Sequence, residues 1–232
     1  MSSEEIRKQH IQKMGEQKGS LFFSLHNDFI NLLVKWKEYQ ELFMQGENRI
    51  QVLNDTAPSF FYRLQRMMID DMVMNIIRMI ESVNSGNRKS KNATLLHLIH
   101  LVEDEQFKKT LLIKYSLVRK NVKQVEIWRN KKIAHRDIEL HTLSEKVSQS
   151  IGLSPKDIRG TINSVKDVFL SIYLNYFDAQ FMYDYIEPQK SAISLLHYLD
   201  LGKRAEFERI KVMKSGDRSD MDFAHIRNRS FE

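Results

Sequence analysis

Apolar residues recur at helical spacing in every long segment of this chain, while strict alternation of apolar and polar residues is almost absent. Spacings of three and four residues place apolar side chains on one face of an α-helix, whereas alternation would indicate a half-buried strand. Only three prolines and eight glycines are spread through the 232 residues. The pattern therefore predicts an all-α protein.

The expected helices begin at recognisable signals. Asp55 or Thr56 is expected to cap a helix that begins at Pro58. Ser154, followed by Pro155, marks the start of a later helix in the same way. In chain order, the expected helices cover residues 21–45, 58–83, 93–103, a long stretch through 111–129, 155–185 and 192–213.

The helix expected over residues 58–83 is apolar on most of its circumference, which is typical of a helix at the centre of a bundle. Its main stripe consists of Phe61, Leu64, Met68, Met72, Ile76 and Met79, and the stripe is widened by Phe60, Met67, Met74, Ile77 and Ile80. Because the methionines lie at core spacing, we assign them no cofactor.

The helix through residues 111–129 carries an arginine where its pattern calls for an apolar residue. Its inward stripe is Leu111, Tyr115, Val118, Val122 and Val125. The next position on that stripe is Arg129, and His135 follows six residues later. A guanidinium cannot lose its charge to escape burial, so it needs an anion or a polar cleft. The alternative is an arginine at a helix end whose stem is packed and whose head reaches water.

Chain length and composition predict one folded core with a small appendage. The chain has 42% hydrophobic and 28% charged residues, which is ordinary for a globular protein. We divide it into an N-terminal polar segment (1–20), a helical bundle (21–188) and a C-terminal helical extension with a tail (189–232).

Charge and cysteine content narrow the function classes. The net charge of +6 favours an anionic partner, most commonly nucleic acid. The absence of cysteine excludes disulfides, a cysteine nucleophile and thiolate-bound zinc. Residues 1–19 lack the apolar stretch of a signal peptide, and no apolar run is long enough to span a bilayer. We therefore expect a cytoplasmic protein without membrane contact.

Arg129-Asn130 followed by Ala134-His135, preceded by the segment 71–81, resembles the signature of the HEPN superfamily, in the form found in abortive-infection defence proteins of bacteria. The resemblance covers residues 21–185. It implies an antiparallel helical bundle that dimerises around the motif helices and acts as a metal-independent endoribonuclease of a toxin or phage-defence system. A related branch has a tyrosine three residues after the histidine, and this tyrosine is the target of nucleotide transfer. Ile138 occupies that position here, so the resemblance gives little support to regulation by nucleotide transfer.

The resemblance also assigns roles to residues. Arg129 and His135 take the catalytic positions, and Asn130 matches the polar residue that commonly follows the arginine. His135 would move the proton of a ribose 2'-hydroxyl, and Arg129 would stabilise charge at phosphorus. Six residues of unbroken α-helix would leave these two side chains about a third of a turn apart. Direct cooperation therefore requires the helix to fray near Ile133, or a second copy to face the first in a homodimer.

Four further cations surround the motif: Lys123, Lys131, Lys132 and Arg136. They are suited to hold RNA by its phosphates, although a solvated basic helix end would have the same composition. A non-catalytic dimer that binds RNA, nucleotide or a partner protein, and a structural or regulatory subunit such as an antitoxin-like partner, remain alternatives. A homodimer is expected, with an antitoxin or another defence-system protein as a possible further partner. His97, His100 and Asp104 share a helical face at the spacing of metal ligands, but their apolar neighbours suit an ordinary amphipathic helix. We expect no metal and no cofactor.

Overall fold

The computed structural model describes residues 2–84, 91–134, 152–188 and 190–215, and every regular element within these ranges is helical. The prediction of an all-α fold is confirmed. The elements are α1 (Ser3–Met14), α2 (Glu16–Phe43), α3 (Glu47–Thr56), α4 (Pro58–Ile80), α5 (Leu95–His100), α6 (Glu105–Asn121), α7 (Lys123–Trp128), the π-helical turn η1 (Arg129–Ala134), α10 (Pro155–Phe177), the 3-10 turn η2 (Tyr183–Tyr185) and α11 (Ala192–Ser215).

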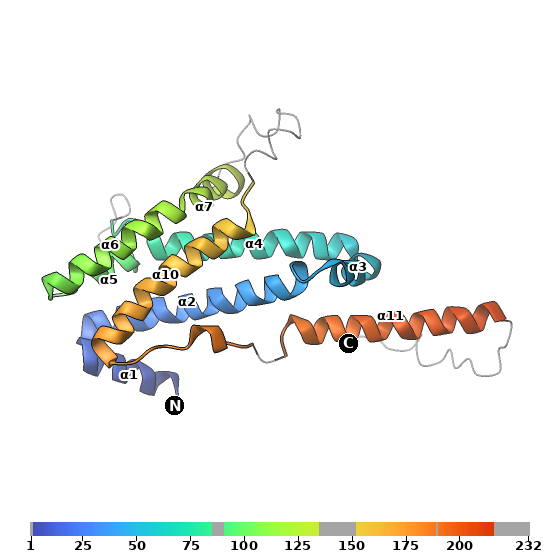
Figure 1. The fold of residues 1–232 in the computed structure, drawn as a ribbon, viewed down its shortest axis with the longest axis horizontal. Helices are drawn as coiled ribbons and strands as arrows, with labels where there is room; N and C mark the ends of the chain where they lie inside the picture. Colours follow the sequence, from blue (N-terminus) through green and yellow to red (C-terminus); the bar gives the residue numbers. More distant parts are fainter. Residues whose placement is uncertain (1, 85–90, 135–151, 189, 216–232) are drawn as a thin grey trace.

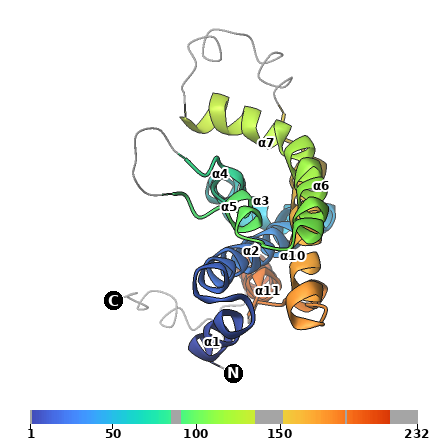
Figure 2. The same ribbon diagram turned by 90° about the vertical axis from the view of Figure 1, so that its left-hand side faces the viewer.

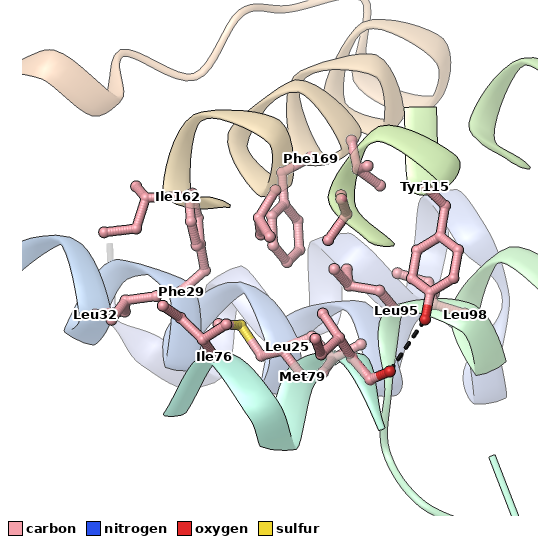
Figure 3. Packing of buried hydrophobic residues seen from close by; sticks show 14 of the residues in the cluster. Leu25, Phe29, Leu32, Ile76, Met79, Leu95, Leu98, Tyr115, Ile162 and Phe169 are labelled. Carbon is pink, nitrogen blue, oxygen red and sulfur yellow. Dashed lines mark hydrogen bonds between the residues drawn. The ribbon is translucent and has the colours of Figure 1, made fainter. Parts of the chain in front are cut away.

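The core of the molecule lies between α2, α4, α6 and α10, which run in alternating directions as an antiparallel bundle (Figure 1). Phe29 of α2 and Phe169 of α10 stack with their ring centroids 5.0 Å apart, and both are fully buried. Tyr115 of α6 donates a hydrogen bond of 3.0 Å to the carbonyl of Ile80, which satisfies its hydroxyl inside this core (Figure 3). Aliphatic side chains from α2, α4 and α5 fill the remaining space around these rings.

The helix α1 lies in the segment that the sequence pattern left as polar. Only His10 and Met14 of this helix are buried, so its apolar signal is weak. Its start is nevertheless encoded by a capping box, in which Ser2 and Glu5 exchange side-chain-to-backbone hydrogen bonds. Gly19 lets α1 pack closely on α2, since a Cβ atom there would lie 2.6 Å from the carbonyl oxygen of His10.

Two start signals read from the sequence had different outcomes. The cap of α10 is confirmed: Ser154 Oγ accepts from the backbone N–H of Asp157, and the Asp157 carboxylate accepts from that of Ser154. The expected cap at Asp55 or Thr56 is wrong, because both residues lie in the last turn of α3 and α4 begins without a side-chain cap. Asp55 instead pairs with Lys203 of α11.

The long helix expected through residues 111–129 is not continuous. Val122 separates α6 from α7, and α7 turns away from α6 to pass over α4 (Figure 2). Beyond Trp128 the backbone is π-helical rather than α-helical. Val118, Val122 and Val125 are nevertheless fully buried, so the inward stripe holds through the bend.

The breadth of the buried face of α4 was overestimated. Met72, Ile76, Ile77, Met79 and Ile80 are buried as expected from the spacing. Phe60 and Met67, which were expected to widen the stripe, are 53% and 66% exposed. The first half of α4 therefore leaves one face open, because α2 and α3 cover only the other side of it.

The helix expected at 155–185 ends earlier, and the C-terminal helix packs on the opposite end of the bundle. Asp178 adopts a left-handed conformation that closes α10 after Phe177. The start of α11 packs on α2 and α3, where a second, smaller core consists of Leu42, Leu53, Phe61, Ala192 and Leu196.

None of the helices in the described ranges combines the length and apolar character needed to cross a bilayer. The three-part division of the chain stays a prediction.

Candidate functional site

The guanidinium of Arg129 lies at the first residue of the π-helical turn, beside the C-terminal end of α4. One third of its side chain is exposed, and its Nη2 atom lies 3.9 Å from Oε1 of Glu81. The Nε atom is buried and finds no hydrogen-bond partner among the described residues. The group is therefore neither free in water nor held by a tight ion pair, since a charge-assisted hydrogen bond would measure about 2.7–2.9 Å.

Trp128, the residue before Arg129, is held by α4. Its indole Nε1–H donates a hydrogen bond of 2.9 Å to Oδ1 of Asp70 in a partly buried setting. The ammonium of Lys132 lies 5.6 Å from the centre of the Trp128 ring, within the range of a cation–π interaction. Trp128 packs at the edge of the core and also connects α4 to the motif.

The cations predicted to hold RNA are exposed where the structure describes them. Lys123, Lys131 and Lys132 lie on the surface, as does Asn130. Neither Lys123 nor Lys131 forms an ion pair with a residue in the described ranges. His135 and Arg136 lie outside the described residues, so their roles stay predictions.

The backbone at the motif changes the geometric argument made from the sequence. Residues Arg129–Ala134 form a π-helix, in which each N–H bonds five residues back instead of four. The separation of a third of a turn expected for an unbroken α-helix does not apply to this stretch. Such π-helical turns are rare and occur frequently at functional sites.

A scan of protein-family models matches the AbiU2 model of the HEPN superfamily over residues 19–195, which is well over half of the chain. The chain belongs to the HEPN_AbiU2 family. The match runs from α2 into the first turn of α11 and includes the Arg129 motif, so the resemblance to abortive-infection HEPN proteins is confirmed. Comparison with curated proteins and with solved structures found no match.

In this AbiU2-family chain the alternative of a metal site at His97, His100 and Asp104 is not supported. Asp104 caps α6, since Oδ1 accepts from the backbone N–H groups of Gln106 and Phe107. His97 Nδ1 lies 3.1 Å from the carbonyl oxygen of Asn92. Among the residues that the structure describes, no three side chains are placed to hold a metal ion.

A second group of ionisable side chains lies buried between α1, α2, α10 and η2. His26 Nε2 lies 3.0 Å from the Tyr183 hydroxyl, and the Tyr173 hydroxyl lies 3.4 Å from His26 Nδ1 and 3.5 Å from His10 Nε2. Burial lowers the pKa of His10 to about 4, and burial together with the charge of His10 lowers the pKa of His26 to about 3. Both histidines are only 3% exposed, which rules out direct contact with a polymeric substrate.

Sequence reasoning found Arg129 in this AbiU2-family protein but missed the two carboxylates that face the motif. Asp70 and Glu81 both belong to the α4 region, about fifty residues before Trp128 and Arg129. The need of Arg129 for an anion was a usable signal for an acidic partner. Which acidic residue faces Arg129 depends on how α7 crosses over α4, and no local sequence pattern encodes that crossing.

Proposed function

We propose that this AbiU2-family protein is a metal-independent endoribonuclease of abortive-infection defence, with Arg129 and His135 as its catalytic pair at a homodimer interface. Family membership supports an abortive-infection role for the HEPN domain. The enzymatic part of the proposal depends on one observation, which is the state of the Arg129 guanidinium.

That guanidinium is positioned but not neutralised. Within the described part of the chain its carboxylate partner is Glu81, 3.9 Å away, and its buried Nε–H has no hydrogen-bond partner there. An unpaired donor on a partly buried cation is costly unless a further anion binds there. A phosphodiester supplies that anion, and its oxygens match the planar donors of arginine.

The proposed reaction is an internal transfer at phosphorus. The ribose 2'-oxygen attacks the adjacent phosphorus, the P–O5' bond breaks, and the products are a 2',3'-cyclic phosphate and a 5'-hydroxyl. His135 takes the 2'-hydroxyl proton or returns one to the leaving 5'-oxygen, while Arg129 stabilises the added negative charge. The substrate must be RNA, because DNA has no 2'-hydroxyl.

The surrounding cations fit a role in binding. Lys123, Lys131 and Lys132 are exposed, and with Arg136 they would contact phosphates without reading bases. Asn130 would support the motif as an exposed polar neighbour. In a homodimer, a two-fold axis next to η1 would bring two copies of the motif together and let them share one RNA strand. A defence effector of this kind also requires an antitoxin or another partner protein to restrain it.

The test is incubation of purified protein with total RNA in excess EDTA, followed by analysis of product ends. We expect fragments with cyclic phosphate and 5'-hydroxyl ends, and loss of cleavage in Arg129→Ala and His135→Ala while the dimer persists in light scattering. Arg63→Ala and His197→Ala, which change exposed residues of the same types on α4 and α11, serve as matched controls. Full cleavage by His135→Ala would remove the imidazole from the mechanism.

The exposed cations alone would also support a second candidate, a dimer that binds RNA without cutting it. In that case the wild type would retain a short RNA in a salt-dependent manner, with no product ends after long incubation. Binding would fall in Lys123→Ala and Lys131→Ala and would be unaffected by His135→Ala.

A further inference from the structure

The contact between Asp70 and Trp128 links the centre of α4 to the residue that immediately precedes Arg129. The indole can only donate and the ionised carboxylate can only accept, so the 2.9 Å hydrogen bond between them has a single polarity. The pair is partly buried, where such a bond is stronger than it would be in water. It is therefore a fixed point for the backbone at Trp128.

The side chains that bury α7 in the core lie near its start. The helix has six residues, it bends away from α6 at Val122, and Val125 is its one fully buried residue. Glu126 contributes an ion pair with Arg119 that is largely on the surface. Val122 and Val125 hold the start of α7 in the core, so the far end of the helix needs an anchor of its own. Trp128, at its far end, supplies that anchor.

Rotation at this point would displace both cations that follow. Arg129 begins the π-helical turn directly after Trp128, and the Lys132 ammonium rests against the Trp128 ring. Asp70 and Glu81 are eleven residues apart, which corresponds to about 16 Å along α4. The Trp128 indole therefore reaches towards Asp70 and the Arg129 guanidinium towards Glu81, in opposite directions along α4. A rotation of the backbone at these two residues would change the direction of the guanidinium.

We propose that Asp70 is a positioning residue for the motif: through the Trp128 indole it fixes the direction of the Arg129 guanidinium. This inference rests on the proposed function for its effect on catalysis. Asp70 itself touches the indole and not the substrate. Misplacing a catalytic group by about 1 Å can cost up to about a hundredfold in rate.

The experiment compares Asp70→Ala, Asp70→Asn, Trp128→Phe and the double variant Asp70→Ala/Trp128→Phe with wild type. Asparagine keeps an oxygen that accepts from the indole, and phenylalanine keeps the ring under Lys132 but removes the donor. Asp71→Ala is the matched control, because Asp71 lies on the same helix and pairs with Lys35 rather than with the motif. Each variant is checked for melting temperature, kcat and KM on RNA.

We expect kcat to fall about tenfold to a hundredfold in Asp70→Ala and in Trp128→Phe, with KM and melting temperature little changed. Asp70→Asn and Asp71→Ala should stay near wild type, and the double variant should be no worse than either single one. An unchanged kcat in Asp70→Ala, an equal loss in Asp71→Ala, or additive losses in the double variant would overturn the inference.

A second readout does not depend on catalysis. The Nε–H resonance of Arg129, identified by its disappearance in Arg129→Lys, should shift in Asp70→Ala and Trp128→Phe but not in Asp70→Asn or Asp71→Ala. A resonance that stays in place in Asp70→Ala overturns the positioning role whatever the activity. A wild type that does not cleave RNA overturns the proposed function alone, and the resonance then decides the inference.

Discussion

Acid should unfold this protein through two buried histidines, His10 and His26. Both are held neutral: burial lowers the pKa of His10 to about 4, and burial with the neighbouring His10 charge lowers that of His26 to about 3. In the unfolded chain a histidine has a pKa of about 6.5. Below that pH the unfolded chain therefore binds two protons that the folded chain does not, and stability falls as pH falls.

The size of the effect follows from these shifts. At pH 5 each histidine lies about 1.5 units below its unfolded pKa and is still neutral in the folded protein, which costs about 2 kcal/mol per residue. The two together remove about 4 kcal/mol between pH 7 and pH 5, a large part of the roughly 5–15 kcal/mol that stabilises a typical domain. The loss continues until the pH reaches the folded values, near 4 and 3.

The assay is urea unfolding followed by circular dichroism at pH 7, 6 and 5. His26→Gln should be less stable than wild type at pH 7, because Tyr183 loses its partner, yet it should lose only about 2 kcal/mol on going to pH 5. His197→Ala, which changes an exposed histidine of α11, should keep the full wild-type loss. Carboxylates such as Glu103 and Glu187, whose pKa values are lowered by hydrogen bonds from lysines, are the same in every variant. Equal pH dependence in wild type and His26→Gln would refute the reasoning.

Three further substitutions, each compared with a control variant, test core packing, helix contact and helix capping by urea unfolding. Phe169→Ala should cost about 3–5 kcal/mol, because it empties a fully buried ring site, whereas Leu174→Ala on the exposed side of the same helix should cost much less. Gly19→Ala should destabilise by about 1–3 kcal/mol, because its Cβ would meet the backbone of α1. Gly160→Ala, with open space around its Cβ, should be neutral or stabilising, and an equal loss there would contradict the steric argument. Asp104→Ala should cost about 1 kcal/mol through loss of the α6 cap, and recovery in an asparagine variant should confirm capping as the cause.

The type of structure could be predicted from the sequence because burial and helical spacing coincide through most of the chain. The stripe from Leu111 to Val125 is buried as its spacing indicated, and α10 begins at the cap read from Ser154. The helix α1 was missed because it buries only His10 and Met14 and shows almost no apolar pattern. A capping box at its start was the one available signal.

The candidate site was only partly predictable for a related reason. Arg129 was identified because it breaks a local pattern, and local patterns are visible in one sequence. Asp70 lies 58 residues before Trp128, and their hydrogen bond exists only because the chain bends at Val122 and passes over α4. A bend of that kind is set by tertiary packing, so neither the carboxylates nor the π-helical backbone could be read from spacing.

The π-helical turn at Arg129–Ala134 holds one residue more than the α-helical turn that it replaces. Deleting Lys131 would let this stretch close as ordinary α-helix while keeping both the arginine and the histidine of the motif. Because a π-helical turn and an α-helical turn each complete about one revolution, the deletion would shorten the stretch by one residue and keep the helix face at its end nearly unchanged. Such a deletion would remove the wide turn while every reactive group of the motif stays present, so it would test the backbone geometry apart from the chemistry.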